Sequence, residues 1–430
     1  MATTIATTTH PEADYESTDE FARLTRDFVN KEFPRYRAEA VRDPHKYPHE
    51  LIEKCAEIGL LGLEIPEEYG GNIVPPVQQA AVMEELARGD GGLGLDVIVQ
   101  NSLTAFPIAR FGTEEQKQRY LPRMASGALI ACFGLTEPNT GSDAKAIRLK
   151  ATWDEAKKGW IVNGAKRFIT SANAAGVMVL AARTGRPEDR GRGITTLLTE
   201  IGPGVPTVEV SIFDKVGQPG SQLCEVVFQD HFVPESGLMG AVNEGWFIIE
   251  STLQHSRIWI AAQGSGIARH ALDEAEKYTH EREQFGKKLA DIPEVANHLR
   301  IIRRQVAIAR ALVHKAAMHE EAGDAQFFVW ASIAKLVAGE TALWAAQEAM
   351  LLHGGMGYTK EMPISQILGD SAVIRIYEGA AHIQVKVIEK HLNREQILAL
   401  LPPTGAFLRN ADDLPTVADI LADVETWKIA

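Results

Sequence analysis

The chain has 430 residues, a formal net charge of −13, 45% hydrophobic residues and 23% charged residues. At roughly 100–200 residues per domain, this length predicts two to four domains, and the composition is that of a soluble globular protein. The acidic excess excludes nucleic acid as the main partner, because phosphate backbones require clustered Lys and Arg. No apolar run reaches the roughly 18–20 residues that cross a bilayer, so we expect no membrane span.

Residues 1–18 are expected to form a flexible leader. They contain no Lys or Arg and lack both a hydrophobic signal segment and the Arg-rich character of a transit peptide. The three cysteines, Cys55, Cys132 and Cys224, lie far apart and form no CxxC pair, which indicates reduced thiols. These features together predict a cytoplasmic protein.

Residues 19–130 are predicted to form an N-terminal helical domain, because apolar residues recur there at helical spacing. Phe21, Leu24 and Phe28 form one such stripe, and a second runs through residues 51–61. Pairs of Gly at 70–71 and of Pro at 75–76 mark loops between the helices.

Residues 131–241 have the texture of strands and are predicted to form a middle β domain. The candidate strands are short and separated by Gly and Pro, and they cover residues 160–162, 166–170, 177–182, 194–198, 207–212 and 224–228. Asn163-Gly164 is the dipeptide most typical of a tight hairpin. The spacing predicts an antiparallel β-barrel or sandwich.

Residues 242–391 return to helical periodicity and are predicted to form a C-terminal helical bundle. Residues 294–321 and 325–352 read as long amphipathic helices joined by a turn at Gly323, as in an antiparallel bundle. Residues 392–430 form a C-terminal extension with an amphipathic stretch at 417–427, for which docking on a neighbouring subunit and disorder are both open. The fold class is therefore mainly α with a central β domain.

Motifs for several other chemistries are absent or incomplete. Gly264-Ser265-Gly266 lies in a helical pattern without a third Gly or a preceding strand, so it does not indicate a dinucleotide-binding turn. A phosphate loop ending at Gly286-Lys287 would need Gly in place of Glu281. His45 and His49 have the spacing of two metal ligands, but prolines interrupt the helix and no third ligand is obvious. We therefore predict no metal site.

Three segments resemble those of a known family when they are considered together. Residues 135–143 read Leu-Thr-Glu-Pro-Asn-Thr-Gly-Ser-Asp, residues 166–171 read Lys-Arg-Phe-Ile-Thr-Ser, and residues 376–379 read Ile-Tyr-Glu-Gly after the glycine-rich segment 352–358. In this order, they resemble the acyl-CoA dehydrogenase family over about residues 20–392. The resemblance implies a helical domain, a β domain and a four-helix bundle, assembled as a homotetramer in which each flavin touches a neighbouring subunit.

The resemblance also implies FAD as the cofactor. It places Thr136 at the pyrimidine side of the flavin, Thr170 near flavin N5, and Phe168 where a Trp commonly packs beside the ring. Arg282 and its neighbours would reach the pyrophosphate and adenine of FAD in the adjacent subunit, and an Arg suits that place because its planar fork pairs with phosphate oxygens. The full set of implied cofactor residues is Phe133, Leu135, Thr136, Gly141, Ser142, Phe168, Ile169, Thr170, Arg282, Gln284, Phe285, Gly354, Gly355 and Ala380.

Glu378 is the implied catalytic base of α,β-dehydrogenation, which removes a proton from Cα and a hydride from Cβ. A carboxylate in an apolar pocket has a raised pKa, which suits proton abstraction near neutral pH. Some branches of the family carry the base immediately before Arg257, but Ser256 occupies that position here and cannot serve. The implied substrate-binding residues are Ser142, Gln254, Arg257, Tyr377 and Gly379.

The chain departs from the family pattern at three positions and leaves the acyl group open. Ala380 replaces a frequent Thr, and Pro293 and Leu351 each replace a frequent Gln, so a polar contact with FAD is lost at each position. Residues expected to line the acyl pocket are Val97, Val99, Gln100 and Ser102. They include no Arg, which disfavours a substrate with a second carboxylate.

Two other functions compete with an acyl-CoA dehydrogenase that passes electrons to an electron-transfer flavoprotein. One is an acyl-CoA oxidase or another flavoprotein of the same fold that reacts with oxygen; retention of Glu378 disfavours the hydroxylases, which need no thioester α-base. The other is a non-catalytic helical assembly that binds acyl-CoA, which would be purified without flavin absorbance.

Overall fold

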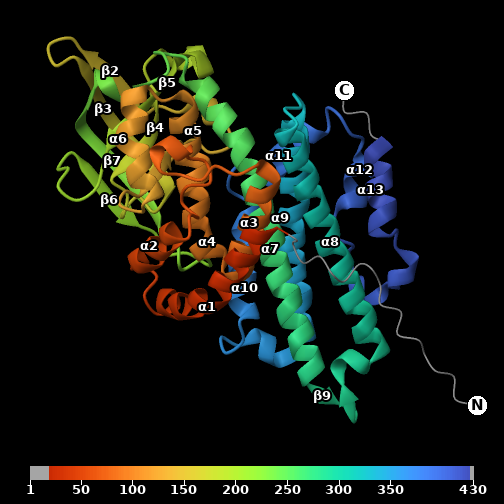
Figure 1. Cartoon of the computed structure of the whole chain (residues 1–430). Helices are drawn as coiled ribbons and strands as arrows, with labels where there is room; N and C mark the ends of the chain where they lie inside the picture. The colour runs from red at the N-terminus through yellow and green to blue at the C-terminus, as the bar shows by residue number, and fades with distance from the viewer. Residues whose placement is uncertain (1–18, 427–430) are drawn as a thin grey trace, which may run out of the picture.

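The computed structural model describes residues 19–426, so the expected leader lies outside the described part. A β-sheet and the short N-terminal helices occupy one end of the molecule, and a bundle of long helices extends from them (Figure 1). The described C-terminal helices lie along the outer side of this bundle (Figure 1).

The N-terminal helical region packs mainly through its third helix. Its elements are α1 (Glu20–Arg42), α2 (His49–Glu57), α3 (Pro76–Gly89), α4 (Gly91–Ile98), a π-helical turn (Val99–Ala105), α5 (Phe106–Phe111) and α6 (Glu114–Ala125). The predicted apolar stripe of α1 is wrong, because Leu24 is 57% exposed. Residues one position along the helix face the core instead, among them Val29 and Phe33, which meet α3 where Gly89 lets the two helices approach closely.

The β domain is one mixed sheet rather than a purely antiparallel one. Its strands are β1 (Ala131–Gly134), β2 (Lys150–Asp154), β3 (Gly159–Thr170), β4 (Val177–Arg183), β5 (Ile194–Glu200), β6 (Val208–Ile212), β7 (Leu223–Pro234) and β8 (Leu238–Met239). The order is β6-β7-β3-β2-β4-β5-β8, and β1 and β2 both pair with β4 in parallel. The antiparallel prediction failed there because neighbouring strands are joined by crossovers and not only by hairpins.

The hairpin predicted at Asn163-Gly164 is also wrong. The strand β3 continues through this dipeptide, and a β-bulge absorbs it, since the register with β7 shifts between Val162 and Gly164. Gly164 has φ 135° and lies against Leu149, so the glycine serves a bulge with close backbone approach. The hairpin turn lies one strand earlier, between β2 and β3.

The C-terminal region is a bundle in which two predicted helices are confirmed to within two residues at each end. Its elements are α7 (Gly245–Glu281), the two-residue strands β9 (Glu283–Gln284) and β10 (Lys287–Lys288), α8 (Pro293–Glu321), α9 (Phe327–Leu352), α10 (Ile364–Ala372), α11 (Ala381–Ile388), α12 (Arg394–Leu400) and α13 (Val417–Thr426). The predicted turn at Gly323 lies between α8 and α9, and this glycine adopts the left-handed conformation. The long helix α7 contacts α3, α8 and α9 and connects the domains.

The glycines rejected as a nucleotide-binding turn instead allow helices to cross closely. A Cβ at Gly266 would lie 2.3 Å from the Glu84 carbonyl oxygen of α3, and one at Gly264 would lie 3.1 Å from Ala338 of α9. Because these contacts are with backbone atoms, a side chain at Gly266 would force α7 away from α3.

Helix α9 is long and apolar enough to cross a membrane by length and composition alone, which the sequence analysis did not anticipate. In the structure, 72% of its apolar window is buried, and the helix packs against α7, α8, α10 and α11. Its hydrophobicity is therefore accounted for by its place in the centre of the bundle.

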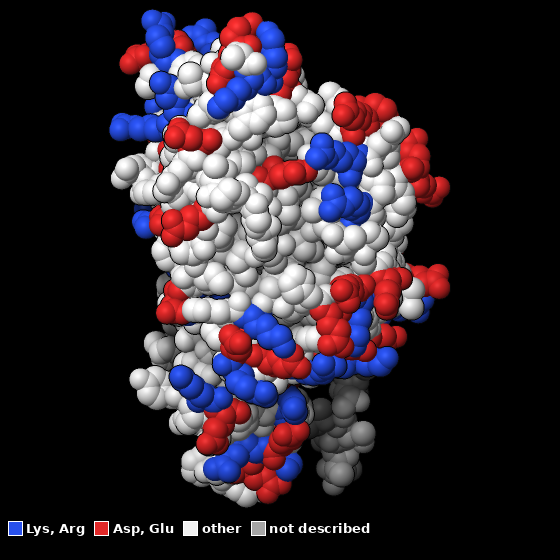
Figure 2. All heavy atoms as spheres, turned by 90° about the vertical axis from the view of Figure 1, so that its left-hand side faces the viewer, with Lys and Arg blue, Asp and Glu red and all other residues white. Residues whose placement is uncertain are grey.

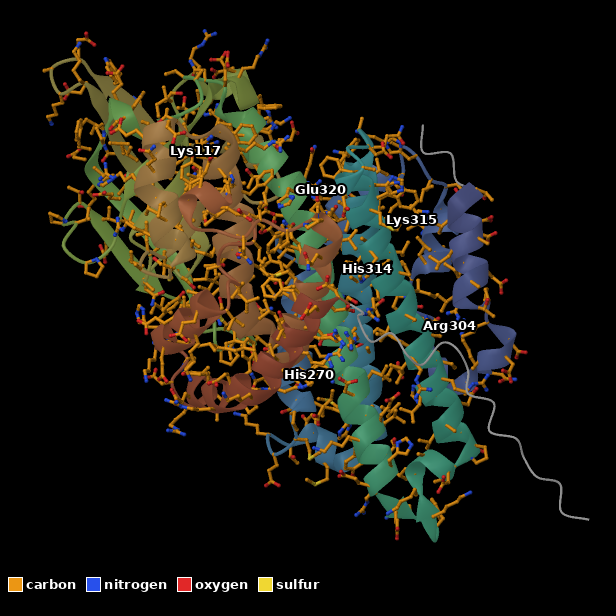
Figure 3. All side chains as sticks on the ribbon, viewed as in Figure 1. Lys117, His270, Arg304, His314, Lys315 and Glu320 are labelled. Carbon is orange, nitrogen blue, oxygen red and sulfur yellow. The ribbon has the colours of Figure 1, made fainter. Side chains whose placement is uncertain are left out.

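The C-terminal extension, as far as residue 426, is ordered against α8 of its own chain, which contradicts the disordered alternative. Asn297 of α8 donates to the Arg409 carbonyl at 2.7 Å and accepts from the Ala411 N–H at 2.8 Å. Arg304 extends from α8 toward the extension (Figure 3) and donates to the Pro415 carbonyl. The extension buries apolar side chains of its own, among them Ile397, Leu400, Val417, Ile420 and Val424.

Charged side chains are unevenly distributed over the face shown in Figure 2. Lys, Arg, Asp and Glu are intermixed toward its upper and lower ends, and a broad band between them carries few charges (Figure 2). The net negative charge is therefore not collected into one acidic patch on this face.

We expect Gly266→Ala to lower the free energy of unfolding by about 1–3 kcal/mol, because the added Cβ meets the backbone of α3. The loss should appear although Ala favours a helix more than Gly does. Thermal or urea unfolding measures it. The matched control is Gly355→Ala, whose Cβ would meet no atom within 4 Å and which should leave stability within about 0.5 kcal/mol of wild type.

Candidate active site

Glu378 lies in a loop before α11 in which two successive residues adopt left-handed backbone conformations. Its φ is 53°, and that of Gly379 is 93°. Glycine tolerates this conformation, whereas a residue with a Cβ is destabilised by roughly 1–2 kcal/mol. The glutamate is therefore held in a strained conformation by its surroundings, which is common where a side chain must be presented to a ligand.

The Glu378 carboxylate is oriented by a hydroxyl on α7. Ser256 donates to Glu378 Oε2 at 2.7 Å and is itself fully buried. Behind it, Ser102 Oγ lies 3.2 Å from Ser256 Oγ and comes from the π-helical turn. Single π-helical turns are rare and often mark functional sites, because the wider turn displaces side chains from regular helical positions.

Three further side chains hold the backbone on either side of Glu378. Lys335 of α9 donates to the Gly379 carbonyl at 2.7 Å, and Gln384 of α11 donates to the same oxygen at 2.9 Å. The Tyr377 hydroxyl donates to Gln263 of α7. The loop is thus fixed from α7, α9 and α11 simultaneously.

Burial and the neighbouring groups shift the pKa of Glu378 in opposite directions. Desolvation of the carboxyl group raises the pKa of Glu378, although the residue as a whole is only half-buried. The Ser256 hydrogen bond and the positive charges of Lys335 and Arg257 act in the other direction. Burial in turn lowers the pKa of Lys335 to about 8. A carboxylate with a raised pKa and a fixed orientation is suited to accept a proton.

Arg257 places a second cation beside this loop. Burial lowers the pKa of Arg257, and the Glu378 carboxylate is its first opposing charge. Its buried Nε finds no hydrogen-bond acceptor among residues 19–426 and lies 4.0 Å from the position that a Cβ on Gly379 would take. A substituent at Gly379 would therefore enter the space between Arg257 and Gln384.

A buried ion network lies directly beside Ser256. The His255 ring lies between Glu64 and Glu320, with Nδ1 2.7 Å from Glu320, which projects from α8 near α7 (Figure 3). Burial alone would lower the pKa of His255, but the two carboxylates raise it to about 10. Phe106 stacks on the ring with centroids 4.1 Å apart. The imidazolium thus fixes α7 to two other segments next to the site.

The predicted flavin loop, residues 135–143, is held by hydrogen bonds from a buried lysine of β3. Lys166 of β3 donates to the Leu135 carbonyl at 2.9 Å and to Glu137 at 2.8 Å, and Thr136 accepts at its carbonyl from the backbone of β3. Burial lowers the pKa of Lys166 to about 8. The outer part of the loop, including Gly141 and Ser142, is exposed, and a Cβ at Gly141 would meet nothing within 4 Å.

Phe168 is turned out of β3 by a second bulge. Its φ is 61°, the register with β7 shifts across it, and its side chain is 55% exposed. Bulges next to active sites often re-aim a side chain in this way. Beyond it, Ile169 is buried, Thr170 is half-buried, and Ser171 donates to Asp96 of α4.

The end of β3 and the Glu378 loop are connected through residues 218–222, which precede β7. The Ser171 N–H donates to the Gln222 carbonyl at 2.8 Å. In the same segment, Gln218 donates its backbone N–H to Asp370 of α10 and contacts Tyr377. The structure therefore brings the predicted β-domain residues and the Glu378 loop to the same junction between domains.

A second group of predicted cofactor residues lies at the other end of the bundle. At roughly 1.5 Å per residue, Arg282 at the end of α7 is about 37 Å from Arg257 along the helix. Gln284 and Phe285 follow in the hairpin β9–β10 at the tip of the bundle (Figure 1), and Phe285 is 92% exposed. Gly354 and Gly355 lie at the same end, since Tyr278 of α7 stacks on His353 immediately before them. One chain does not bring the two groups together.

The remaining predicted residues have less specific surroundings. Phe133 and Gln254 are half-buried, Ala380 precedes α11 without contributing a side-chain cap, and Leu351 is 57% exposed. Gln100 is a structural brace, because its side chain bonds the backbone of Leu129 and Ala131. Of the expected acyl-pocket residues, Ser102 is connected to Glu378 by hydrogen bonds through Ser256.

Sequence reasoning missed three residues that hold the Glu378 loop. Lys335 was detectable as the one lysine in the otherwise apolar first half of α9. Gln263 and Gln384 carry no comparable signal, because a glutamine in a helical pattern most often indicates a residue on the exposed face of the helix. Ser256 was considered as a possible base and rejected, whereas its role as a hydrogen-bond donor to Glu378 was not anticipated.

We expect Ser256→Ala to raise the pKa of Glu378, because the lost hydroxyl stabilises the ionised carboxylate. The protonated fraction at a given pH near neutrality should therefore increase. Infrared titration of the carboxyl band, with Glu378→Gln as the reference that lacks it, measures the change. Ser256→Thr retains a hydroxyl and is the matched control; an unchanged titration in Ser256→Ala would contradict the geometry.

Comparisons with known proteins place this site in a family. Three family models match the chain: the acyl-CoA dehydrogenase N-terminal domain over residues 15–128, the middle domain over 132–231 and the C-terminal domain over 243–393. The chain therefore belongs to the acyl-CoA dehydrogenase family, and it is an oxidoreductase of that family.

Individual relatives align with this chain over nearly their whole length. The short-chain specific acyl-CoA dehydrogenase of Megasphaera elsdenii is 37% identical over 87% of this chain and 98% of its own. The structure of butyryl-CoA dehydrogenase from Megasphaera elsdenii has a TM-score of 0.81 at 35% identity, covering 86% of this chain and 96% of that one. A chain in a structure described as the electron transferring flavoprotein of Acidaminococcus fermentans has a TM-score of 0.82 at 34% identity, covering 87% and 98%.

Proposed function

We propose that this protein oxidises the Cα–Cβ bond of an acyl-CoA thioester to the 2-enoyl-CoA, with Glu378 as the base that removes the α proton. The observation that carries the proposal is the Glu378 carboxyl group itself. It has a raised pKa, lies in a strained left-handed loop and accepts an orienting hydrogen bond from Ser256. A solvated loop carboxylate would have none of these features.

The surrounding residues have separate tasks in this reaction. Glu378 takes the α proton onto its carboxylate, and Ser256 fixes the direction in which that carboxylate points. Arg257 supplies positive charge beside the loop, where the thioester would gain negative charge as the proton leaves. The backbone N–H of Glu378, by resemblance to the family, would bind the thioester oxygen, and one well-aimed donor of this kind contributes perhaps about 3–4 kcal/mol.

The residues present fit FAD as the cofactor. Gly141, Gly354 and Gly355 each face open space, so backbone can approach a ligand there, and Phe168 presents an exposed ring beside Thr170. Bound FAD would supply the two-electron acceptor, taking the hydride from Cβ at flavin N5. Thr136, Ser142, Phe168 and Thr170 would hold the flavin end, while Ala380 offers no hydroxyl.

Two partners follow from the same arrangement. Because Arg282 lies about 37 Å along α7 from Arg257, we propose that it holds the FAD of a neighbouring chain in a homotetramer. We also propose an electron-transfer flavoprotein as the electron acceptor, supported by the similarity to a chain in the Acidaminococcus fermentans structure. The acyl group is proposed only as a class, a CoA thioester with hydrogen at both Cα and Cβ.

We expect anaerobic addition of acyl-CoAs to bleach the flavin of the wild-type holoenzyme, and Glu378→Gln to slow bleaching by about 10²–10⁴-fold or more, because a positioned general base contributes that much. Rapid-mixing absorbance with a panel of linear, branched and alicyclic acyl-CoAs measures both. The bleaching rate of wild type should rise with pH through the raised pKa of Glu378, since only the ionised carboxylate accepts a proton.

The matched control for this experiment is Glu361→Gln, which removes an exposed carboxylate in the segment between α9 and α10 and should bleach like wild type. If no acyl-CoA bleaches wild type, dehydrogenation is wrong; if Glu378→Gln bleaches as fast as wild type, another residue is the base. Reoxidation of the reduced protein by air, compared with an electron-transfer flavoprotein, separates an oxidase from a dehydrogenase.

A second prediction concerns sharing of the cofactor between chains. Arg282→Met should purify with little flavin, because the pyrophosphate loses its charged partner. Refolding or co-expressing Arg282→Met with Glu378→Gln should restore activity, since sites that combine Glu378 of one chain with Arg282 of another are intact. Flavin content and bleaching of the mixed assembly measure this; a mixture no more active than its separate parts would show that each chain holds its cofactor alone.

A further inference from the structure

Lys335 is a buried cation behind the catalytic loop to which neither the family comparison nor the sequence assigns a role. It lies in the first half of α9, the central apolar helix of the bundle, and is 1% exposed. Its Nζ donates to the Gly379 carbonyl at 2.7 Å. Among the described residues no carboxylate oxygen lies within 4.0 Å of it, so it is not one half of a close ion pair.

A lysine is unusual in this place because burying an ammonium group is costly without a partner. A glutamine or serine could donate a hydrogen bond to one carbonyl at lower cost, and Gln384 already does so to the same oxygen at 2.9 Å. The hydrogen bond alone therefore does not account for the lysine. What distinguishes Lys335 from Gln384 is its charge, and Glu378 is the first carboxylate on which that charge acts.

The carbonyl that Lys335 holds follows the base directly. Glu378 and Gly379 are both left-handed, and the Gly379 carbonyl is the next backbone acceptor along the chain. Fixing this carbonyl fixes the backbone at Gly379, the residue bonded to Glu378, so a shift of Gly379 would displace Glu378 relative to Ser256. Lys335 on α9 and Ser256 on α7 therefore fix the base from two sides, one through the backbone and one through the carboxylate.

We propose that Lys335 is a positioning residue for the base: it holds the Gly379 carbonyl so that Glu378 keeps its left-handed conformation, and its charge favours the ionised carboxylate. This inference rests on the proposed function, in which Glu378 removes the α proton. Lys335 touches neither substrate nor cofactor, and it acts through the loop and through its electric field.

The other charged groups near Lys335 and Glu378 also affect the charge states of these two side chains. Arg257 opposes the charge of Lys335, and Glu340 on α9 supports it together with Glu378. On the Glu378 side, Arg257 and His255 add to the effect of Lys335 in favouring the ionised carboxylate. Removing Lys335 leaves these groups in place, so the expected result is a raised pKa of Glu378 and not a loss of the base.

The test is single-turnover flavin reduction of the holoenzyme as a function of pH, using the acyl-CoA that bleaches wild type fastest. We expect Lys335→Met, which fills the same space without a charge or donor, to slow reduction on the order of 10²-fold at neutral pH through misplacement of the base. The rise of rate with pH should move to higher pH. Flavin content and the dissociation constant for the acyl-CoA should stay close to wild type.

Gln384→Met is the matched comparison, because it removes the other donor to the same carbonyl without changing charge. It should slow reduction without moving the pH profile. Lys335→Gln keeps a donor and lacks the charge; it should move the profile to higher pH, and it tests the proposal if Lys335→Met does not fold.

The outcomes separate this inference from the function on which it rests. Glu378→Gln is measured in the same series. If Glu378→Gln is inactive while Lys335→Met and Lys335→Gln both keep the wild-type rate and pH profile, the role of Lys335 is wrong and the base assignment stands. If Glu378→Gln remains active, the base assignment is wrong and the inference is overturned with it.

Discussion

The left-handed backbone at Glu378 and Gly379 depends on helices from different parts of the sequence holding the same short loop. Ser256 contacts it from α7, Lys335 from α9 and Gln384 from α11. These side chains meet only because α7 and α9 pack closely, and Gly264 on α7 makes that approach possible. The geometry of one carboxylate thus depends on the helix crossings of the whole bundle, since a shift of any helix would release one of its contacts.

The same dependence extends to the β domain. The predicted flavin loop is held by the buried pair Lys166 and Glu137, and Ser171 at the end of β3 donates to Asp96 on α4. The N-terminal helices therefore fix the end of β3 as well as the bundle. Because buried polar contacts are strong only when their partners are aligned, domain packing and site geometry are expected to be lost together.

Helical periodicity was sufficient to predict the bundle, and α8 and α9 were found nearly to the residue because a long amphipathic or apolar pattern has few alternative readings. The β domain was less predictable. Asn163-Gly164 has the composition of a hairpin but lies in a bulge of β3, and only the neighbouring strands decide between these outcomes. Parallel pairing of β1 with β4 is likewise invisible in local sequence.

In the site, too, residues that belong to a sequence motif were predicted, and residues that act through contacts between distant segments were not. Glu378 and the loop at 135–143 were predicted from motifs, and their places in the structure are compatible with those roles. Gln384 and the donor role of Ser256 were not predicted, because a hydrogen bond between distant segments leaves no pattern in either one. Packing was equally hard to predict at Leu24. This residue is more hydrophobic than Thr25, yet Thr25 is the one that α1 buries against the protein core.

Helix α9 has a consequence during synthesis that the folded bundle conceals. As it leaves the ribosome, before α7 and α8 have closed around it, a 26-residue helix of this hydropathy is a candidate for recognition as a membrane segment. Lys335 is the only basic residue in it, and a lysine in such a segment disfavours insertion, by roughly 2.5–3.5 kcal/mol at the centre and by less toward either end. The side chain that holds the Gly379 carbonyl in the finished protein would thus also disfavour insertion of the nascent helix into a lipid bilayer.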